Sequence, residues 1–389
     1  MDIVHIFRAP FGGLFRHVID LANGQIARGH RVGLITDASR DTPRSENILA
    51  ALMPKLALGL TRIRIPREPC VQDIRALWQV SRRIQQTNAD VVHGHGAKGG
   101  ALARLTLTPR KIVRAYTPHG GSLHDAVGST FHLMLEKALL PLGNLYIFES
   151  GYSQRTFERK IGTTAATMRI IHNGIGESEF VPISPAPDAA DIVYLGELRR
   201  LKGIDVLINA IALLRRNGRP VSAVIVGDGQ AEVELRAMVA DHDLGDLIIF
   251  KSAMPARAAL ALGKIVVMPS RAESLPYVAL ETAAAGKPLI ATNVGGIPEI
   301  YGPLAHLLIP PDNVDALAQS ILATIDYPAV ALQTALTLRT RIAASFSVDA
   351  MVDGVLSSYQ QALGARSQNR ADGVVRSSSL SEGVDSPTR

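Results

Sequence analysis

Cysteine and aromatic residues are scarce in this chain of 389 residues. It contains one cysteine, Cys70, and 5% aromatic residues. One cysteine cannot form an internal disulfide, which excludes a disulfide-stabilised secreted domain and predicts a reducing compartment. No aromatic stacking pattern interleaves the basic residues, which argues against nucleic acid as a partner.

Long apolar runs are also missing. No stretch approaches the roughly 18 residues that a membrane-spanning helix requires. The start of the sequence, MDIVHIF, lacks the charged, apolar and cleavage segments of a secretory signal. We therefore expect a cytoplasmic protein, and we disfavour a non-catalytic two-lobed binding protein, because that class usually carries an export signal.

Size and charge indicate the organisation of the chain. A length of 389 residues with 47% hydrophobic residues and 33 glycines predicts two α/β domains. Residues 62–114 contain eleven Lys or Arg against Glu68, Asp73 and Asp90, while the whole chain has a net charge of +6. This basic segment indicates an anionic partner, such as a phosphate-linked acceptor or an acidic membrane surface. A solvated basic face remains the alternative.

Short apolar runs alternate with amphipathic stretches in both halves, which predicts two doubly wound parallel sheets facing across a cleft. Expected strands are 2–8, 31–36, 90–93, 111–116, 146–149, 168–171, 191–195, 222–226, 248–250, 265–268 and 288–292. Expected helices are 14–28, 71–87, 124–139, 151–161, 203–216, 230–242 and 348–363, with a further helix that Ser274 caps, Pro276 begins and Gly286 ends.

The expected domains follow from this pattern. They are a first domain at 1–180, a Pro-rich linker at 181–190, a second domain at 191–345, a returning helix at 346–363 and a disordered tail at 364–389.

The stretch 265–301 contains the most informative motif. A buried strand is followed by a loop with Glu273 and then by a helix with Glu281. In open parallel sheets, ligands bind at the carboxyl ends of the strands, and the free N–H groups at a helix start suit phosphate. Neither position suits a core residue, so both carboxylates are expected to face a ligand.

This stretch resembles a known family. Glu273, Glu281, the sequence AGKP at 285–288 and the sequence GGIPE at 295–299 are similar to the donor-site signature of the family-4 retaining glycosyltransferases. The resemblance covers about residues 1–362 and implies the GT-B fold. It also implies that Glu273 holds sugar hydroxyls and that Glu281 holds the nucleotide ribose.

The resemblance assigns further residues. Lys202 matches the lysine that binds the diphosphate, and His119 matches the acceptor-domain histidine near the sugar. The implied catalytic residues are Glu273, His119, Lys202 and Arg199, and the implied substrate-binding residues are Gly12, Gly13, Asn173, Gly196, Gly227, Ser274, Leu275 and Glu281.

One position departs from the family pattern. The family places an arginine where this chain has Glu197. A carboxylate aimed at a diphosphate is unfavourable, so we expect Arg199 to supply the missing positive charge and Glu197 to orient it through a bidentate pair.

Two candidate metal sites are considered and set aside. His93 and His95 flank Gly94, but no Cys, Asp or Glu nearby in the sequence completes a zinc site. Asp241 and Asp243 form an Asp-x-Asp pair, but they fall at the end of an expected helix, where acidic residues are ordinary surface charge. We expect no metal and no cofactor beyond the nucleotide-sugar substrate.

The predicted activity is therefore transfer of a sugar from a UDP- or GDP-sugar to a glycan or lipid-linked acceptor. The expected context is synthesis of bacterial surface polysaccharide or lipopolysaccharide, with peripheral association at the inner face of the membrane. Two alternatives stay open: a nucleotide-sugar epimerase of the same fold, and an NAD-dependent oxidoreductase that uses the sequence GDG at 227–229, which lacks the third glycine of a dinucleotide fingerprint.

Overall fold

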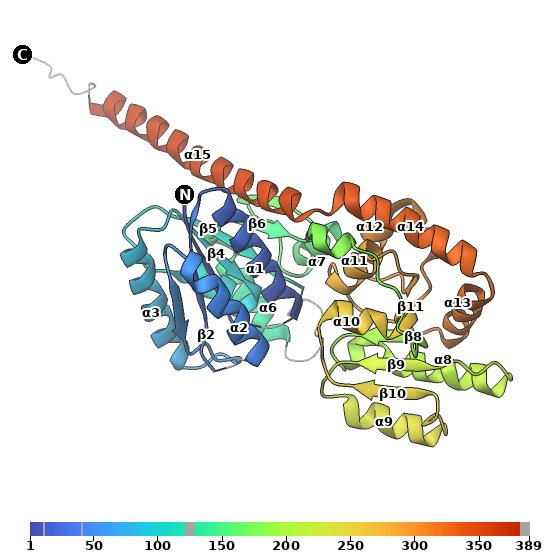
Figure 1. The fold of residues 1–389 in the computed structure, drawn as a ribbon. Helices are drawn as coiled ribbons and strands as arrows, with labels where there is room; N and C mark the ends of the chain where they lie inside the picture. The colour runs from blue at the N-terminus through green and yellow to red at the C-terminus, as the bar shows by residue number, and fades with distance from the viewer. Residues whose placement is uncertain (11, 40–41, 121–128, 382–389) are drawn as a thin grey trace, which may run out of the picture.

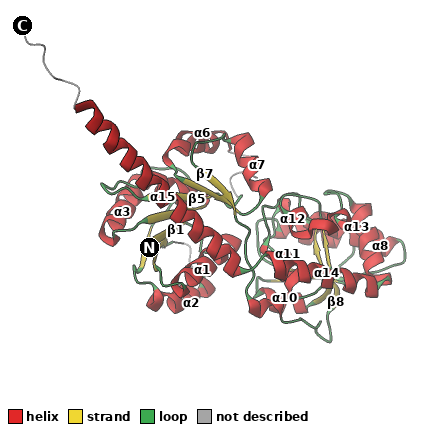
Figure 2. Cartoon of the chain, turned by 90° about the horizontal axis from the view of Figure 1, so that it is seen from above, coloured by secondary structure: helices red, strands yellow, loops and turns green. Residues whose placement is uncertain are grey.

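The computed structural model describes residues 1–10, 12–39, 42–120 and 129–381 (Figure 1). Within them the chain forms two parallel sheets, each flanked by helices, that lie side by side (Figure 2). The larger sheet has the strand order β3-β2-β1-β4-β5-β6-β7, and the smaller has the order β10-β9-β8-β11-β12. The expectation of two doubly wound parallel sheets is confirmed.

The first domain contains seven strands. They are β1 (Asp2–Phe7), β2 (Arg31–Asp37), β3 (Leu60–Ile63), β4 (Val91–His95), β5 (Val113–Thr117), β6 (Leu145–Phe148) and β7 (Thr167–Ile170). Its helices are α1 (Gly12–Ala27), α2 (Pro43–Leu52), η1 (Met53–Lys55), α3 (Gln72–Thr87), α4 (Gly96–Leu105), α6 (Ser129–Leu139), η2 (Leu140–Leu142), α7 (Gly151–Lys160) and η3 (Glu177–Phe180).

Strand β1 is central in this sheet, and it is buried because helices cover both faces. Val4 packs in one cluster with Val80 of α3, while Ile3 packs in another with Leu21 of α1. Side chains alternate between the two faces of a strand. His5 therefore lies on the face that α1 covers, and it is fully buried there.

The second domain contains five strands. They are β8 (Ala190–Leu195), β9 (Ala223–Val226), β10 (Ile248–Lys251), β11 (Gly263–Met268) and β12 (Leu289–Ala291). Its helices are η4 (Arg200–Lys202), α8 (Ile204–Arg216), α9 (Glu232–Asp241), α10 (Ala256–Ala261), α11 (Tyr277–Ala284), α12 (Ile297–Tyr301), η5 (Gly302–Leu307), α13 (Val314–Asp326) and α14 (Pro328–Ser345).

Helix α15 (Val348–Ser381) returns to the first domain and runs past its edge (Figure 1). Val352 and Tyr359 are fully buried in a cluster with Leu21 of α1. The helix continues to Ser381, beyond residue 363, where the returning helix was expected to end. Residues 382–389 lie outside the described part of the chain.

Most expected elements are present with ends shifted by a few residues, but some expectations differ from the structure. Helix α11 begins at Tyr277 with Pro276 at its N-cap, and no side chain caps it, so the capping role expected for Ser274 is wrong. Residues 124–128 of the expected helix 124–139 lie outside the described residues, and α6 begins at Ser129. Strand β3 and helices α2, α4, α10 and α12 to α14 were not expected.

In the described ranges, no single helix is long and apolar enough to cross a membrane. Helices α13 and α14, bent by 102° at their junction, meet the length and composition criteria only as a pair. Ile321, Leu338 and Ile342 of this pair are buried in the cores of the second domain.

Candidate functional site

The loop between β11 and α11 presents Glu273 at the carboxyl edge of the smaller sheet. Its carboxylate is largely buried and accepts hydrogen bonds from Lys202 Nζ at 2.6 Å and Ser270 Oγ at 2.8 Å. Lys202 ends the short helix η4, which follows β8. The structure therefore brings together the two residues expected to hold the sugar and the diphosphate.

Two glycines allow the neighbouring loops to pack tightly against this loop. Gly203 and Gly295 have φ values of +67° and +59°, which side-chain-bearing residues rarely adopt. A Cβ on Gly203 would lie 1.9 Å from the carbonyl oxygen of Pro269, and one on Gly295 would lie 1.7 Å from that of Glu273. The loop that carries Glu273 is thus held between the loop of Lys202 and the start of α12.

Glu281, on α11, contacts a residue of the other domain. Arg16 of α1 hydrogen-bonds Glu281, bonds Glu179 at 2.5 Å, and lies 4.5 Å from the ring centre of Tyr277. Burial raises the pKa of Glu281, and the charge of Arg16 opposes that rise. The carboxylate expected to bind ribose is therefore paired with an arginine that the sequence did not single out.

The two domains are joined in the structure by three residues that were expected to bind substrate, namely Asn173, Ser274 and Leu275. Asn173 Nδ2 donates to the backbone oxygen of Leu275 at 2.9 Å, and Asn173 Oδ1 bonds His17 Nδ1 at 3.0 Å. Ser274 hydrogen-bonds the carboxylate of Glu149. Both ends of the Asn173 amide are engaged within the protein, and the Leu275 side chain is buried.

Glu299, the last residue of the GGIPE motif, also links the domains. Its carboxylate accepts backbone N–H bonds from Gly151 and Tyr152, each at 2.9 Å, and contacts His172 Nε2 at 3.2 Å. Burial opposes ionisation, but these hydrogen bonds outweigh it and lower the pKa of Glu299. A carboxylate at the first turn of α7 is favoured by the helix dipole.

Gly12 and Gly13 are the first two residues of α1, and Gly13 lies against Tyr277 at the start of α11. Two helix N-termini, one from each domain, therefore lie close to each other. Gly196 and Gly227 follow β8 and β9 at the same edge of the second sheet as Glu273.

Arg199 does not form the expected bidentate pair. A single contact of 3.6 Å joins its Nη1 to Glu197 Oε2, and both side chains are about half exposed. Such an exposed pair stabilises little. Arg199 and Arg200 both line a small pocket next to α8 and α9. The expectation that Glu197 orients Arg199 through two hydrogen bonds is wrong.

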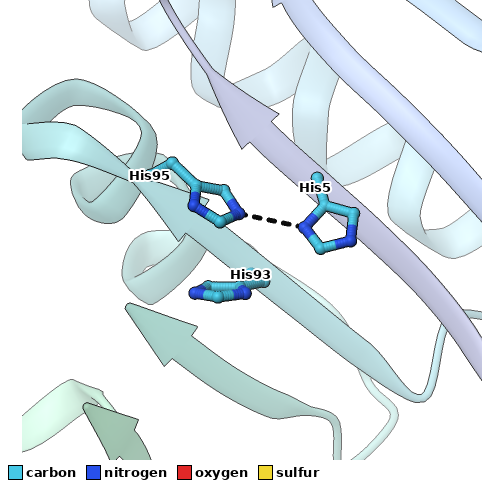
Figure 3. Close-up of side chains that lie close together, drawn as sticks. All are labelled: His5, His93 and His95. Carbon is cyan, nitrogen blue, oxygen red and sulfur yellow. Dashed lines mark hydrogen bonds between the residues drawn. The ribbon is translucent and has the colours of Figure 1, made fainter. Parts of the chain in front are cut away.

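A cluster of histidines was missed as a whole by the sequence analysis. His5 of β1 bonds His95 of β4, with His93 below them (Figure 3). His95 in turn bonds His119, whose φ is +54°, and His17 packs edge-on against His119 with ring centres 4.8 Å apart. His17, through Asn173, connects the cluster to the loop that carries Glu273.

Burial determines the charge of this cluster. It lowers the pKa of His5 and His17 to about 4, and that of the other three histidines well below its ordinary range. All five are therefore neutral at pH 7.

The histidines of this cluster are also close enough together to be compared with a metal site. Two groups of three, namely His5, His93, His95 and His17, His95, His119, have ligand atoms within 4.8 Å of one another. The sequence analysis considered Cys, Asp and Glu as the further ligands of His93 and His95, whereas the sheet places a third histidine, His5, beside them. All six ring nitrogens of His5, His93 and His95 are, however, engaged in hydrogen bonds within the protein.

The Asp-x-Asp pair lies elsewhere. Asp243, just after α9, is 97% exposed and sits 3.5 Å from Arg215. The surroundings of this residue are those of a surface ion pair.

A pocket of about 660 Å³ lies in the first domain next to His95. Helices α3, α4 and α6 line much of it, mainly with apolar side chains. Its apolar lining includes Leu14, Ile74, Leu77, Leu102, Leu105, Phe131 and Leu135, and its polar lining consists of Arg8, Arg67, Glu68, Asp73, His95, Lys98, His132 and Glu136. The histidine cluster thus contacts the pocket through His95 and the loop that carries Glu273 through His17 and Asn173.

Two family models match the chain. Residues 11–179 match "Glycosyltransferase Family 4", and residues 189–326 match "Glycosyl transferases group 1". The chain is 36% identical over 372 residues to D-inositol 3-phosphate glycosyltransferase of Pseudarthrobacter chlorophenolicus, covering 82% of this chain and 83% of that protein. It is 26% identical over 363 residues to glycogen synthase of Mycobacterium tuberculosis, covering 86% of this chain and 87% of that protein.

Solved structures have the same fold. Sucrose-phosphate synthase of Thermosynechococcus elongatus superimposes with a TM-score of 0.77 at 22% identity, covering 94% of this chain and all of that one. HepE of Anabaena, solved with UDP-glucose, superimposes with a TM-score of 0.75 at 19% identity, covering 95% of this chain and 100% of that one.

The fold is that of the GT-B glycosyltransferases. More particularly, the chain belongs to the glycosyl transferases of group 1, family 4.

Proposed function

We propose that the protein is a retaining, metal-independent transferase that moves a sugar from a nucleotide-diphosphate sugar to a glycan or lipid-linked acceptor. The observation that carries this proposal is the Lys202 to Glu273 pair at 2.6 Å, in the loop that leads into α11, whose first residue, Tyr277, lies against Gly13 of α1. A fixed ammonium group and free backbone N–H groups stabilise a departing diphosphate without a metal ion.

The state of Glu273 supports retention of configuration. A carboxylate already bonded to Lys202 and Ser270 is a poor base, so the acceptor proton goes to the leaving group instead. The acceptor oxygen bonds to the anomeric carbon on the face from which the diphosphate leaves. The bond between that carbon and the diphosphate oxygen breaks, and this oxygen takes the hydroxyl proton.

The donor is a UDP- or GDP-sugar. UDP is supported by HepE, which was solved with UDP and with UDP-glucose. Glu281 is placed on α11 to receive the ribose hydroxyls once they displace Arg16, since a carboxylate accepts hydrogen bonds from two adjacent hydroxyls.

The acceptor occupies the apolar pocket beside His95, which suits a molecule with an apolar body and a sugar or phosphate end. Arg8 and Arg67 are cationic members of its lining, while Lys98 is paired with Asp73 at 2.6 Å. Relatives named for D-inositol 3-phosphate and for teichuronic acid biosynthesis support an acceptor with anionic groups and a role in surface polysaccharide or lipopolysaccharide synthesis.

Membrane association is peripheral. Ile74 and Trp78 of α3 are 73% and 59% exposed, and Arg82 lies 5.5 Å from the ring centre of Trp78. Apolar side chains beside arginines suit a surface of anionic lipids. Flotation with phosphatidylserine vesicles should therefore be lost in 0.5 M salt, and salt-insensitive flotation would contradict a peripheral contact.

A screen of nucleotide sugars tests the function. Thermal shifts identify the donor, and nucleotide diphosphate release is then followed with and without candidate acceptors. Transfer predicts release that depends on acceptor, with the linkage retaining the anomeric configuration of the donor by NMR. Interconversion of the sugar without added acceptor would instead show an epimerase.

A further inference from the structure

A row of three hydrogen bonds runs through the first domain from α1 to the active site. Gln25 Oε1 lies 2.8 Å from His5 Nε2, His5 Nδ1 lies 2.9 Å from His95 Nε2, and His95 Nδ1 lies 3.1 Å from His119 Nε2. Gln25, His5 and His95 are at most 1% exposed. Three segments of the fold, α1, β1 and β4, thus connect to the loop after β5.

The direction of this row follows from its first member. A carbonyl oxygen only accepts, so His5 carries its proton on Nε2 and accepts at Nδ1. His95 must then donate from Nε2 and accept at Nδ1. His119 in turn donates from Nε2, which leaves its Nδ1 without a proton. Each neutral imidazole holds one N–H, so no ring in the row can change its tautomer alone.

We propose that Gln25 sets the tautomer of His119 through His5 and His95, so that His119 offers a bare Nδ1 lone pair to a hydroxyl of the substrate. This inference rests on the proposed function for the identity of that hydroxyl. Gln25, His5 and His95 are positioning residues, because they act on the substrate only through His119.

The neighbouring histidine is not a member of the row. His93 stacks near His95 with ring centres 3.9 Å apart, but its nitrogens bond Tyr359 at 2.6 Å and Thr117 at 2.8 Å. Thr117 is as deeply buried as the row itself. Tyr359 also hydrogen-bonds Gln25. Thr117→Val therefore removes a buried hydrogen bond of the same cluster but none of the three hydrogen bonds of the row, which makes it a matched control.

The test uses the full chain labelled with ¹⁵N-histidine and compares the parent, Gln25→Met and Thr117→Val. Long-range ¹H–¹⁵N spectra distinguish protonated from bare ring nitrogens, and His119→Gln assigns the signals of His119. In the parent and in Thr117→Val, we expect His119 to be protonated at Nε2 alone. Gln25→Met, which keeps the volume but removes the accepting oxygen, should give a mixture of tautomers at His119.

Kinetics give a second measurement. With the donor that the screen identifies, Gln25→Met should lower kcat about tenfold and leave KM for the donor unchanged, whereas Thr117→Val should change kcat less than twofold. Calorimetry with UDP should give equal affinity for all three proteins. A change in KM for the donor alone would indicate a merely structural effect and would overturn the proposal.

The spectra test the tautomer of His119 independently of whether the protein transfers a sugar. Protonation of His119 at Nδ1 in the parent protein would overturn it even if Gln25→Met failed to fold. An unchanged tautomer in Gln25→Met would also overturn it, even in an active transferase. Conversely, loss of Nε2 protonation in Gln25→Met would support the row even if no nucleotide sugar were turned over.

Discussion

Acidification should destabilise this protein through its buried histidines. His5 and His17 have a folded pKa of about 4, against about 6.5 for an unfolded histidine. Between these values the unfolded chain binds protons that the folded chain does not. The contribution of these two histidines to the free energy of unfolding is therefore fully present above pH 6.5 and is lost as the pH falls toward 4.

The magnitude can be worked out for a change from pH 7.5 to 5.5. At pH 5.5 a histidine with an unfolded pKa of about 6.5 and a folded pKa of about 4 reduces the free energy of unfolding by about 1.4 kcal/mol. His5 and His17 together remove about 3 kcal/mol. The free energy of unfolding of a typical domain is only about 5–15 kcal/mol, so this loss is large. His93, His95 and His119 act in the same direction.

Urea unfolding at several pH values measures this effect, because the slope of the unfolding free energy against pH counts the protons taken up. We expect a slope of at least about two protons near pH 5.5 from His5 and His17 alone. His17→Gln should reduce this slope by about one proton. Equal stability at pH 7.5 and 5.5 would refute the assignment of neutral, buried imidazoles.

Four further outcomes test the active site. Glu273→Gln should lower kcat by about 10²-fold with little change in UDP affinity. Glu281→Gln should weaken UDP binding about tenfold with a smaller effect on kcat. An equal loss of UDP affinity in both variants, measured by calorimetry, would contradict the two roles. Arg16→Met should raise UDP affinity about fivefold, because the ribose no longer has to displace Arg16 from Glu281. Unchanged affinity would show that ribose does not displace Arg16. Arg199→Ala should raise KM for the donor and lower kcat more than Arg200→Ala does, and parent kinetics in Arg199→Ala would remove it from the site. Transfer should persist in EDTA, and a loss restored by Mn²⁺ or Mg²⁺ would show a metal requirement.

Local patterns in the sequence predicted the sheets, most of the helices and the loop that carries Glu273. A buried parallel strand is a short apolar run wherever it occurs, and a helix shows its period within a few turns, so neither depends on distant residues. The family motifs singled out Glu273 and Lys202, and the fold explains why the two residues meet. Each follows a strand of the same sheet, and parallel strands bring their carboxyl ends to one edge.

The contacts between distant segments were decided only by the tertiary structure. His5 and His95 meet because β1 lies beside β4 in the sheet, an order that no local pattern reveals. Arg16 reaches Glu281 across 265 residues because the two domains meet at α1 and α11. The sequence by itself determined which elements form and which residue types they carry. The packing of strands and domains decided which of those residues touch, because long-range contacts depend on the whole arrangement of the chain.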